Sequence, residues 1–476
     1  MKKKTLLPLA ALLALSACAV GPDYHRPDAP IPSAYKESKD WKPAEPKAVN
    51  DDPAWWSRFN DPVLDRLERE VTVSSQTILQ SEAAYRAAIA AADSANAQLF
   101  PTFGVSGDVT RSKLGANSAN GRSSGIILNE GSVGASASWT LDVWGKLRRN
   151  LEAAEASADS SKAQLAAARL TVQAALASDY FSLRGADELS RLLNATVDAY
   201  EKSLTITRNQ YRAGTAAKSD VDQATTQLEA TRAQAIAVGV TRAQLEHAIA
   251  VLLGKAPADF RLEPEAGLPD APRIPLSLPS ALLERRPDVA AAERQMAAAN
   301  AQIGVAISAY FPSLTLGGSV TNTSNALNTL FNSSNQVWSF GPSLAETVID
   351  WGARDAAVAQ ARANYDAEVA NYRQTVLTAL QQVEDDLIAE SRLEREAVVE
   401  KRAVDSASEA ERLIFNQYKA GTVAYTSVVT AQAAALAARQ SALTIHQNQL
   451  TTSVALLQAL GGGWTGLGDE VTASAP

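Results

Sequence analysis

The spacing of apolar residues along the chain changes from helical to alternating at two places. After Phe100-Pro101 apolar residues occupy every second position, and the alternation returns beyond a stretch rich in glycine, serine and asparagine. This pattern predicts two amphipathic strands within about 102–143, joined by a loop. The same change follows Phe311-Pro312 and predicts a second pair of strands within about 313–348.

Helical spacing, with few glycines or prolines, fills most of the remaining sequence. It predicts one helix of about 37 residues over Asp61–Leu99 and a shorter helix over Pro287–Tyr310, whose first turn tolerates the proline. A much longer helix follows each strand pair, and the first runs over Lys146–Gln210, about 65 residues or roughly 100 Å. Return helices are expected over Lys218–Leu253 and Ser427–Leu460. Helices of this length need neighbours, so coiled-coil-like packing is expected.

The two halves of the chain share landmarks at one fixed offset of 207 residues. Trp144-Gly145 recurs as Trp351-Gly352, Tyr211–Thr215 as Tyr418–Thr422, and Leu253-Gly254 as Leu460-Gly461. Such a long period predicts a duplicated supersecondary unit rather than a solenoid. The expected parts are a first repeat at 61–259 with its hairpin turn at 211–220, a linker at 260–280, a second repeat at 281–464 with its turn at 418–427, and a tail at 465–476.

The N-terminus is typical of a secretory signal peptide. Basic residues precede an apolar run too short to span a bilayer as a mature helix, and Leu15-Ser16-Ala17 leads to Cys18, the only cysteine. Residues 15–18 resemble the lipobox of bacterial lipoproteins, which implies a lipoprotein signal over 1–17 and acylation of Cys18. An extended segment is expected over 18–60. In such signals an aspartate after the cysteine indicates inner membrane retention. Ala19 stands there instead, so the outer membrane is the expected destination.

Composition excludes some functions. A net charge of -8 and a pI near 5.2 disfavour a nucleic-acid partner, which would need a basic surface. After the signal no further window of about 18 apolar residues is found, so a membrane-spanning helix is not expected. A mature chain that crosses a membrane would do so as strands.

Four amphipathic strands leave two sheet edges open, and unpaired backbone groups cannot face hydrocarbon. Further copies must close such a sheet: two copies give eight strands with a filled interior, and three give twelve around a water-filled bore. The sequence therefore predicts a homotrimer, mainly α-helical with a membrane β-barrel portion. The residues expected in the aromatic girdles that contact outer membrane lipid are Phe103, Trp139, Trp338 and Phe340. A soluble sandwich is the alternative, but it gives no reason for helices of 100 Å.

Several short motifs, taken in order, resemble the TolC-like outer membrane factors of tripartite efflux pumps, in their lipoprotein branch. They are Gly21–Tyr24, Leu283–Val289, the two Tyr-x-Ala-Gly-Thr turns, and Leu460–Trp464. The resemblance covers nearly the whole chain. It implies a trimer with a twelve-stranded outer membrane barrel, a long periplasmic tube of helices and an equatorial belt, acting as a passive exit duct for drugs or other toxic solutes. It also implies two partners, a periplasmic adaptor (membrane fusion) protein and an inner membrane transporter.

The same resemblance implies that the hairpin turns line a periplasmic mouth, which tyrosine and aspartate links close at rest. We therefore expect a hydrogen bond between Tyr418 and Asp220. The alternative for Asp220 is a solvated acid near a helix start, where the helix dipole favours it. The rest of the predicted gate is Ser427, Val428 and Thr430. Many members of the resembled family carry an acidic residue at the position of Thr430. Here Ser427 and Thr430 are neutral hydroxyls beside Val428 and Val429, so a ring of valines is expected to narrow the mouth instead. The residues expected to contact the adaptor are Tyr211, Arg212, Gly214, Thr215, Lys419, Gly421 and Thr422.

No catalytic, metal or cofactor motif is found. His25, His247 and His446 do not correspond under the offset of 207 residues, which disfavours a metal site. The acidic run Glu384–Asp386 lies on a long polar helix, where a charge run is usually a solvated face. The glycines at 461–463 lack the preceding strand and following helix of a phosphate loop. The chain is not expected to be an enzyme.

Two other functions fit part of the pattern. The same architecture can serve one-step polypeptide secretion, although the lipoprotein signal favours efflux. A coiled-coil envelope scaffold without transport is the other alternative, but a scaffold needs no lipid-facing strands.

Overall fold

The computed structural model describes residues 19–29, 31–32, 34–37, 54–113, 127–274 and 285–467. The predicted signal at 1–17, Cys18, the boundary between the predicted linker and second repeat, and most of the predicted tail lie outside the described residues. The chain divides into two compact units. The first comprises the chain up to Asp28 with 85–160 and 292–372, and the second comprises 29–84, 161–291 and 373 onward.

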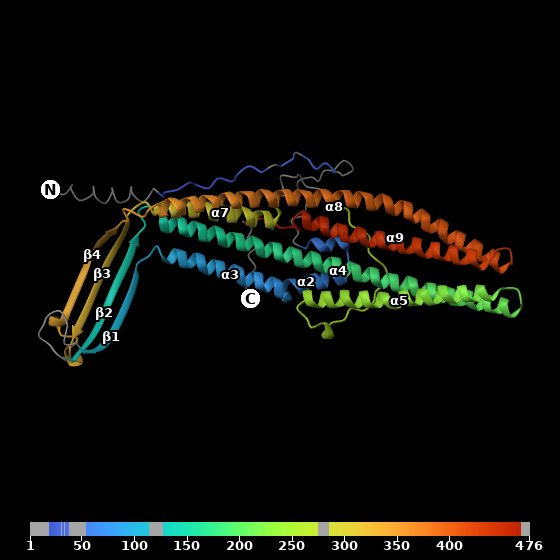
Figure 1. The fold of residues 1–476 in the computed structure, drawn as a ribbon, viewed down its shortest axis with the longest axis horizontal. Coiled ribbons are helices and arrows are strands. Elements are labelled where there is room, and N and C mark those ends of the chain that lie inside the picture. The colour runs from blue at the N-terminus through green and yellow to red at the C-terminus, as the bar shows by residue number, and fades with distance from the viewer. Residues whose placement is uncertain are drawn as a thin grey trace. The chain divides into compact units, whose positions relative to one another are not determined.

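The order of elements repeats, as the duplication predicts (Figure 1). The first half contains α2 (Pro62–Ser74), α3 (Gln76–Ala97), β1 (Thr102–Lys113), β2 (Ile127–Leu141), α4 (Lys146–Arg212) and α5 (Lys218–Leu252). The second contains α7 (Pro287–Ser308), β3 (Ser313–Ser324), β4 (Gln336–Ala345), α8 (Ala353–Lys419) and α9 (Tyr425–Ala459). The short 3-10 helices are η3 (Trp55–Phe59), η4 (Pro257–Asp259), η5 (Leu327–Thr329) and η6 (Ser333–Asn335). The predicted strand pairs, long helices and return helices are confirmed.

The four strands form one antiparallel sheet in the order β1-β2-β3-β4 (Figure 1). The register places Val105 opposite Ala135, Ala135 opposite Val320, and Val320 opposite Trp338. Paired residues point to the same side of a sheet, so most apolar positions of the four strands share one face. The other face is mainly serine, threonine and glycine, with Asp108 and Glu130 among them. Among the strands that the structure describes, β1 and β4 each have one unpaired edge.

Both long helices begin at an aspartate that accepts hydrogen bonds from their first backbone N–H groups. Asp142 accepts from Leu147 and Arg148, each at 2.9 Å, and Asp350 accepts from Arg354 at 3.1 Å. An acidic side chain at a helix N-terminus also faces the positive end of the helix dipole. The two helices have 67 residues each, close to the length that the sequence predicts.

The prediction of one unbroken helix over Asp61–Leu99 is wrong, because the helix breaks at Ser75. That residue has an extended ψ of 123° and separates α2 from α3. At the break the Ser74 carbonyl lies against Gly254, where an added Cβ would stand 2.5 Å from that oxygen. The local sequence contains a signal for the break. The hydroxyls of Thr72 and Ser74 donate to the backbone carbonyls of Glu68 and Glu70, both at 2.8 Å. Such bonds compete with regular helix geometry.

Two other expectations need correction. One described helix, α5, is long and apolar enough to cross a membrane by length and composition alone, so the expectation that no such window follows the signal is wrong. Within the second unit, however, α5 carries Arg242, whose Nε binds Asp187 of α4 at 2.7 Å. The predicted extended segment over 18–60 ends in the 3-10 helix η3, in which Trp55 and Phe59 are buried.

The N-terminal residues of the first unit are fastened to its helices. Val20 donates its backbone N–H to the Trp144 carbonyl at 3.1 Å. The buried Arg149 side chain binds Asp23 at 2.8 Å and the Val20 carbonyl at 3.3 Å. Gly21 approaches Gly304 so closely that an added Cβ would lie 2.5 Å from its Cα. This segment is therefore held close to the junction between β2 and α4.

Candidate functional site at the helix-hairpin turns

Both hairpin turns have the same backbone design. Gly214 and Gly421, with φ of +77° and +75°, end α4 and α8 in the left-handed conformation. The next residue donates back across the turn, Thr215 to the Gln210 carbonyl at 2.9 Å and Thr422 to the Gln417 carbonyl at 3.0 Å. These bonds satisfy carbonyls that a helix end otherwise leaves without partners, and the conformation favours glycine. The repeated Tyr-x-Ala-Gly-Thr motif thus encodes a helix stop.

The predicted adaptor-contacting residues are all exposed in the second unit, as that role requires. Tyr211 is 46% exposed, and Lys419 extends its ammonium over the Phe415 ring at 5.0 Å. The remaining members of this exposed set are Arg212, Gly214, Thr215, Gly421 and Thr422. Their contact with an adaptor stays a prediction.

Tyr418 and Tyr425 join the two hairpins. Their rings meet edge to face with centroids 5.0 Å apart, inside a buried cluster formed by α4, α5, α8 and α9. The Tyr418 hydroxyl donates to Thr207 at 3.4 Å, and the Tyr425 hydroxyl lies 3.2 Å from the Ser203 hydroxyl. Burial raises the pKa of both phenols. Two neutral tyrosines from the second hairpin are therefore fixed to one face of α4.

The expected hydrogen bond between Tyr418 and Asp220 is not formed within the chain. Asp220 instead accepts from the Ala217 backbone N–H at 3.3 Å, which caps the start of α5, while Tyr418 binds Thr207. The side chain of Asp220 thus caps the N-terminus of its own helix, where the helix dipole favours an acidic group. Ser427 has the equivalent place at the start of α9, by the offset of 207 residues.

The predicted place of Val428 in a valine ring is also corrected. Val428 is 1% exposed and packs in the cluster with Tyr200, Leu204 and Val221 of the first hairpin. A side chain buried within its own chain cannot line a mouth. Thr430 is exposed and Ser427 is partly exposed, so these two remain available for the predicted gate.

Sequence reasoning missed a basic residue that ties each return helix to its long helix. Arg232 of α5 pairs with Glu201 of α4, and Arg439 of α9 binds Ser408 and Glu411 of α8, each at 3.0 Å. The two arginines are 207 residues apart, so the offset that revealed the turns could have found them. An ion pair therefore joins the two helices of each hairpin, in addition to their apolar contacts.

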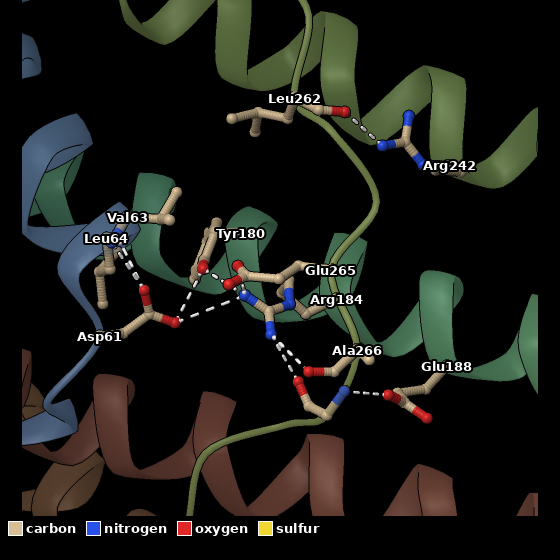
Figure 2. A network of polar contacts seen from close by, with 11 residues as sticks. Asp61, Val63, Leu64, Tyr180, Arg184, Glu188, Arg242, Leu262, Glu265 and Ala266 are labelled. Carbon is tan, nitrogen blue, oxygen red and sulfur yellow. Dashed lines mark hydrogen bonds and ion pairs between the residues drawn. The ribbon is translucent and has the colours of Figure 1, made fainter.

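A polar network attaches the linker to the helices of the second unit (Figure 2). The buried Arg184 of α4 donates to Tyr180 at 2.7 Å, to Glu265 at 2.5 Å and to the Gly267 carbonyl at 2.6 Å. Tyr180 in turn donates to Asp61 at 2.8 Å, and burial raises the pKa of this phenol. Figure 2 shows Asp61 at the start of α2, Tyr180 and Arg184 of α4, and Glu265 of the linker converging. The predicted linker at 260–280 is thus a bound element over its described residues.

The predicted girdle aromatics lie on the apolar face of the sheet. Phe103, Trp338 and Phe340 are 79%, 74% and 71% exposed within the chain. Trp139 is less exposed, and its Nε1 donates to the Leu99 carbonyl at 2.9 Å where α3 ends. An apolar face this open is suited to a non-aqueous neighbour. Their contact with lipid stays a prediction.

The acidic run on α8 is only partly solvated, in contrast to the expectation. Glu384 accepts from the backbone N–H groups of Lys36 and Glu37 at 2.7 and 3.0 Å, so it binds the N-terminal segment within the second unit. Burial and the neighbouring Asp385 raise the pKa of Asp386 to about 6. Within the described ranges there is no group of three or more histidine, cysteine or acidic residues that could hold a metal.

Comparison with known proteins agrees with this geometry. The sequence model of the family described as "Outer membrane efflux protein" matches residues 68–255 and again 278–462. The chain belongs to this family. It is 30% identical to the probable efflux pump outer membrane protein TtgC of Pseudomonas putida, over 97% of this chain and 96% of TtgC. It is 29% identical to the probable outer membrane lipoprotein SilC of Salmonella typhimurium, over 98% of this chain and all of SilC.

A solved structure, that of the outer-membrane channel OprN, matches with a TM-score of 0.85 at 29% identity. The match covers 94% of this chain and all of the OprN chain. The predicted resemblance to TolC-like outer membrane factors, the duplicated helical fold with its strand portion, and the outer membrane location are confirmed for this member of the efflux family. TtgC is named as a pump component and OprN as a channel, which is consistent with a chain that is not an enzyme.

Proposed function

We propose that three copies of this chain form a passive exit duct of a tripartite efflux system, working with a periplasmic adaptor and an inner membrane transporter. The observation that supports the trimer is the four-stranded sheet, which has one apolar face, one polar face and two unpaired edges. Three such sheets joined edge to edge satisfy every backbone group and leave a polar lumen. Relatives are named for efflux of toluene, solvents and antibiotics, which supports small toxic molecules as the cargo.

The lipid anchor at Cys18 belongs to the same proposal. Ala19 lies against Gly145, where an added Cβ would be 2.7 Å from the Ala19 Cα, so the described chain begins beside the end of β2. The name of SilC, an outer membrane lipoprotein, supports this assignment.

The function is tested by deleting the gene and measuring susceptibility to drugs and organic solvents, with and without candidate pump partners. We expect increased susceptibility, restored by the intact chain. Native mass measurement in detergent should show a trimer. A stable monomer would contradict the duct, and a trimer whose loss leaves susceptibility unchanged but blocks export of a polypeptide would favour secretion instead.

The gate in this proposal is held by the packing of Tyr418 and Tyr425 against α4. Tyr418→Ala removes a buried ring from the cluster, which costs about 3–5 kcal/mol for an aromatic side chain and loosens the second hairpin. We expect higher single-channel conductance in a planar bilayer. Tyr211→Ala changes the same motif position in the first hairpin, where the ring is exposed, and should leave conductance unchanged. Equal conductance of the two variants would refute this role.

A further inference from the structure

The two Trp-Gly landmarks lie in opposite environments within the first unit. Trp144, between β2 and α4, stacks on Phe311 with ring centroids 4.7 Å apart and planes 21° apart. Its Nε1 donates to the Pro312 carbonyl at 2.9 Å. Phe311 and Pro312, which follow α7, thus bind the side chain of Trp144, which precedes α4.

Trp351, between β4 and α8, has no equivalent stacking partner within the described part of the chain. Its side chain is 96% exposed, and its backbone takes a left-handed φ of +57°, which is costly for a residue other than glycine. The sequence gives a reason for the different backbone: Trp351 follows Asp350 directly, whereas Val143 separates Asp142 from Trp144. A large aromatic side chain held outward in this way needs cover from another molecule.

The Phe-Pro pair equivalent to Phe311-Pro312 in the first half is also exposed. Phe100-Pro101 follows α3 just as Phe311-Pro312 follows α7, and the Phe100 ring is 62% exposed. The chain therefore contains one tryptophan that stacks on a Phe-Pro pair, Trp144 on Phe311. It also contains a second tryptophan, Trp351, and a second Phe-Pro pair, Phe100-Pro101. These two do not contact each other among the residues that the structure describes.

Sheet topology determines how the second pair can form. The completed pair lies where the end of β2 runs antiparallel to the start of β3, with Leu141 opposite Leu314. The two free edges are those of β4, which ends before Trp351, and β1, which starts after Phe100. Antiparallel pairing of β4 with β1 of a second copy repeats the arrangement. The register that sets Trp351 opposite Phe100 also sets Pro342 opposite Val109, so the apolar face stays continuous.

We propose that Trp351 of each copy stacks on Phe100 of the partner subunit, with its indole N–H directed to the carbonyl of the partner subunit's Pro101. This rests on the trimer of the proposed function and adds the contact that closes it. Each copy offers Trp351 at one edge and Phe100 at the other, which is a heterologous contact able to close into a ring. The competing occupant for Trp351 is lipid headgroups, where tryptophan is also favoured.

Crosslinking between separately tagged copies tests this contact. One copy carries Trp351→Cys and the other Phe100→Cys, co-expressed and treated with a short bismaleimide. We expect a crosslinked product that contains both tags. The matched control replaces Phe100→Cys by Phe311→Cys, the equivalent position that Trp144 occupies within the chain, and should give only the background level, as should each single variant.

The outcomes separate the contact from the duct. A native trimer whose Trp351–Phe100 crosslink stays at background, or which crosslinks equally at position 311, overturns the contact and leaves the trimer intact. A monomer by native mass overturns the proposed function itself. As a second readout, Trp351→Ala should speed dissociation of the trimer in SDS by about tenfold, and Trp351→Phe should restore most of the stability. Unchanged dissociation of Trp351→Ala would assign the side chain to lipid.

Discussion

Replacement of Arg184 by alanine is expected to lower the free energy of unfolding by about 3–5 kcal/mol, because it leaves buried acceptors without their cation. The Arg184 side chain is 7% exposed, and its guanidinium lies 3.6 Å from the Asp61 carboxylate, which itself is 8% exposed. The same group holds the Gly267 carbonyl of the linker at 2.6 Å. Denaturant titration of the detergent-solubilised protein measures the change, and protease cleavage of the linker should become faster.

The matched control is Arg191→Ala on the same helix. Arg191 is 60% exposed and pairs only with Glu188 among the described side chains, so an effect below about 1 kcal/mol is expected. Equal losses for the two variants would show that the network of Figure 2 contributes no more than a surface ion pair.

Glu68→Gln is expected to stabilise the protein by about 3 kcal/mol at pH 7. Glu68 of α2 is fully buried, and neither carboxylate oxygen has a hydrogen-bond partner among the described residues. Burial raises its pKa from 4.5 to about 9. Between these two values the unfolded chain is ionised and the folded chain holds a proton, so folding takes up a proton and native stability falls as pH rises.

The pH dependence distinguishes this cause from a change in packing. The advantage of Glu68→Gln should be absent near pH 4.5, grow through neutral pH, and level off near pH 9, because glutamine does not ionise. Glu70→Gln on the same helix removes a partly exposed carboxylate that pairs with Lys255, and it should destabilise slightly at pH 7. A Glu68→Gln gain that is constant across pH would point to packing alone.

The fold was largely predictable because duplication supplies two instances of each element. The offset of 207 residues aligned the helix stops, the strand pairs and the glycine turns, and alternation assigned each strand its apolar face. The break at Ser75 was missed because the apolar helical pattern continues across it and hides the local signal at Thr72 and Ser74. A tertiary contact, the approach of Gly254 to the Ser74 carbonyl, accompanies the break.

The candidate site was predicted in place but not in detail. The turn residues around Gly214 and Gly421 are exposed at helix ends, as expected. Within the chain Tyr418 has a different partner from the expected one, since hydrogen-bond partners depend on how helices rotate against each other. A rotation that turns one face of α9 inward takes Val428 into the core and brings Tyr425 to Ser203.

Sequence by itself determined the duplicated architecture, the faces of the strands and the points where helices stop, because these follow from local periodicity and from backbone conformations that glycine permits. Only the tertiary structure decided which of two equivalent motifs is covered. Tyr418 is buried whereas Tyr211 is exposed, and Trp144 is partly buried against Phe311 whereas Trp351 is exposed. Side-chain environment depends on neighbours distant in sequence, and a duplicated chain does not give both copies the same neighbours.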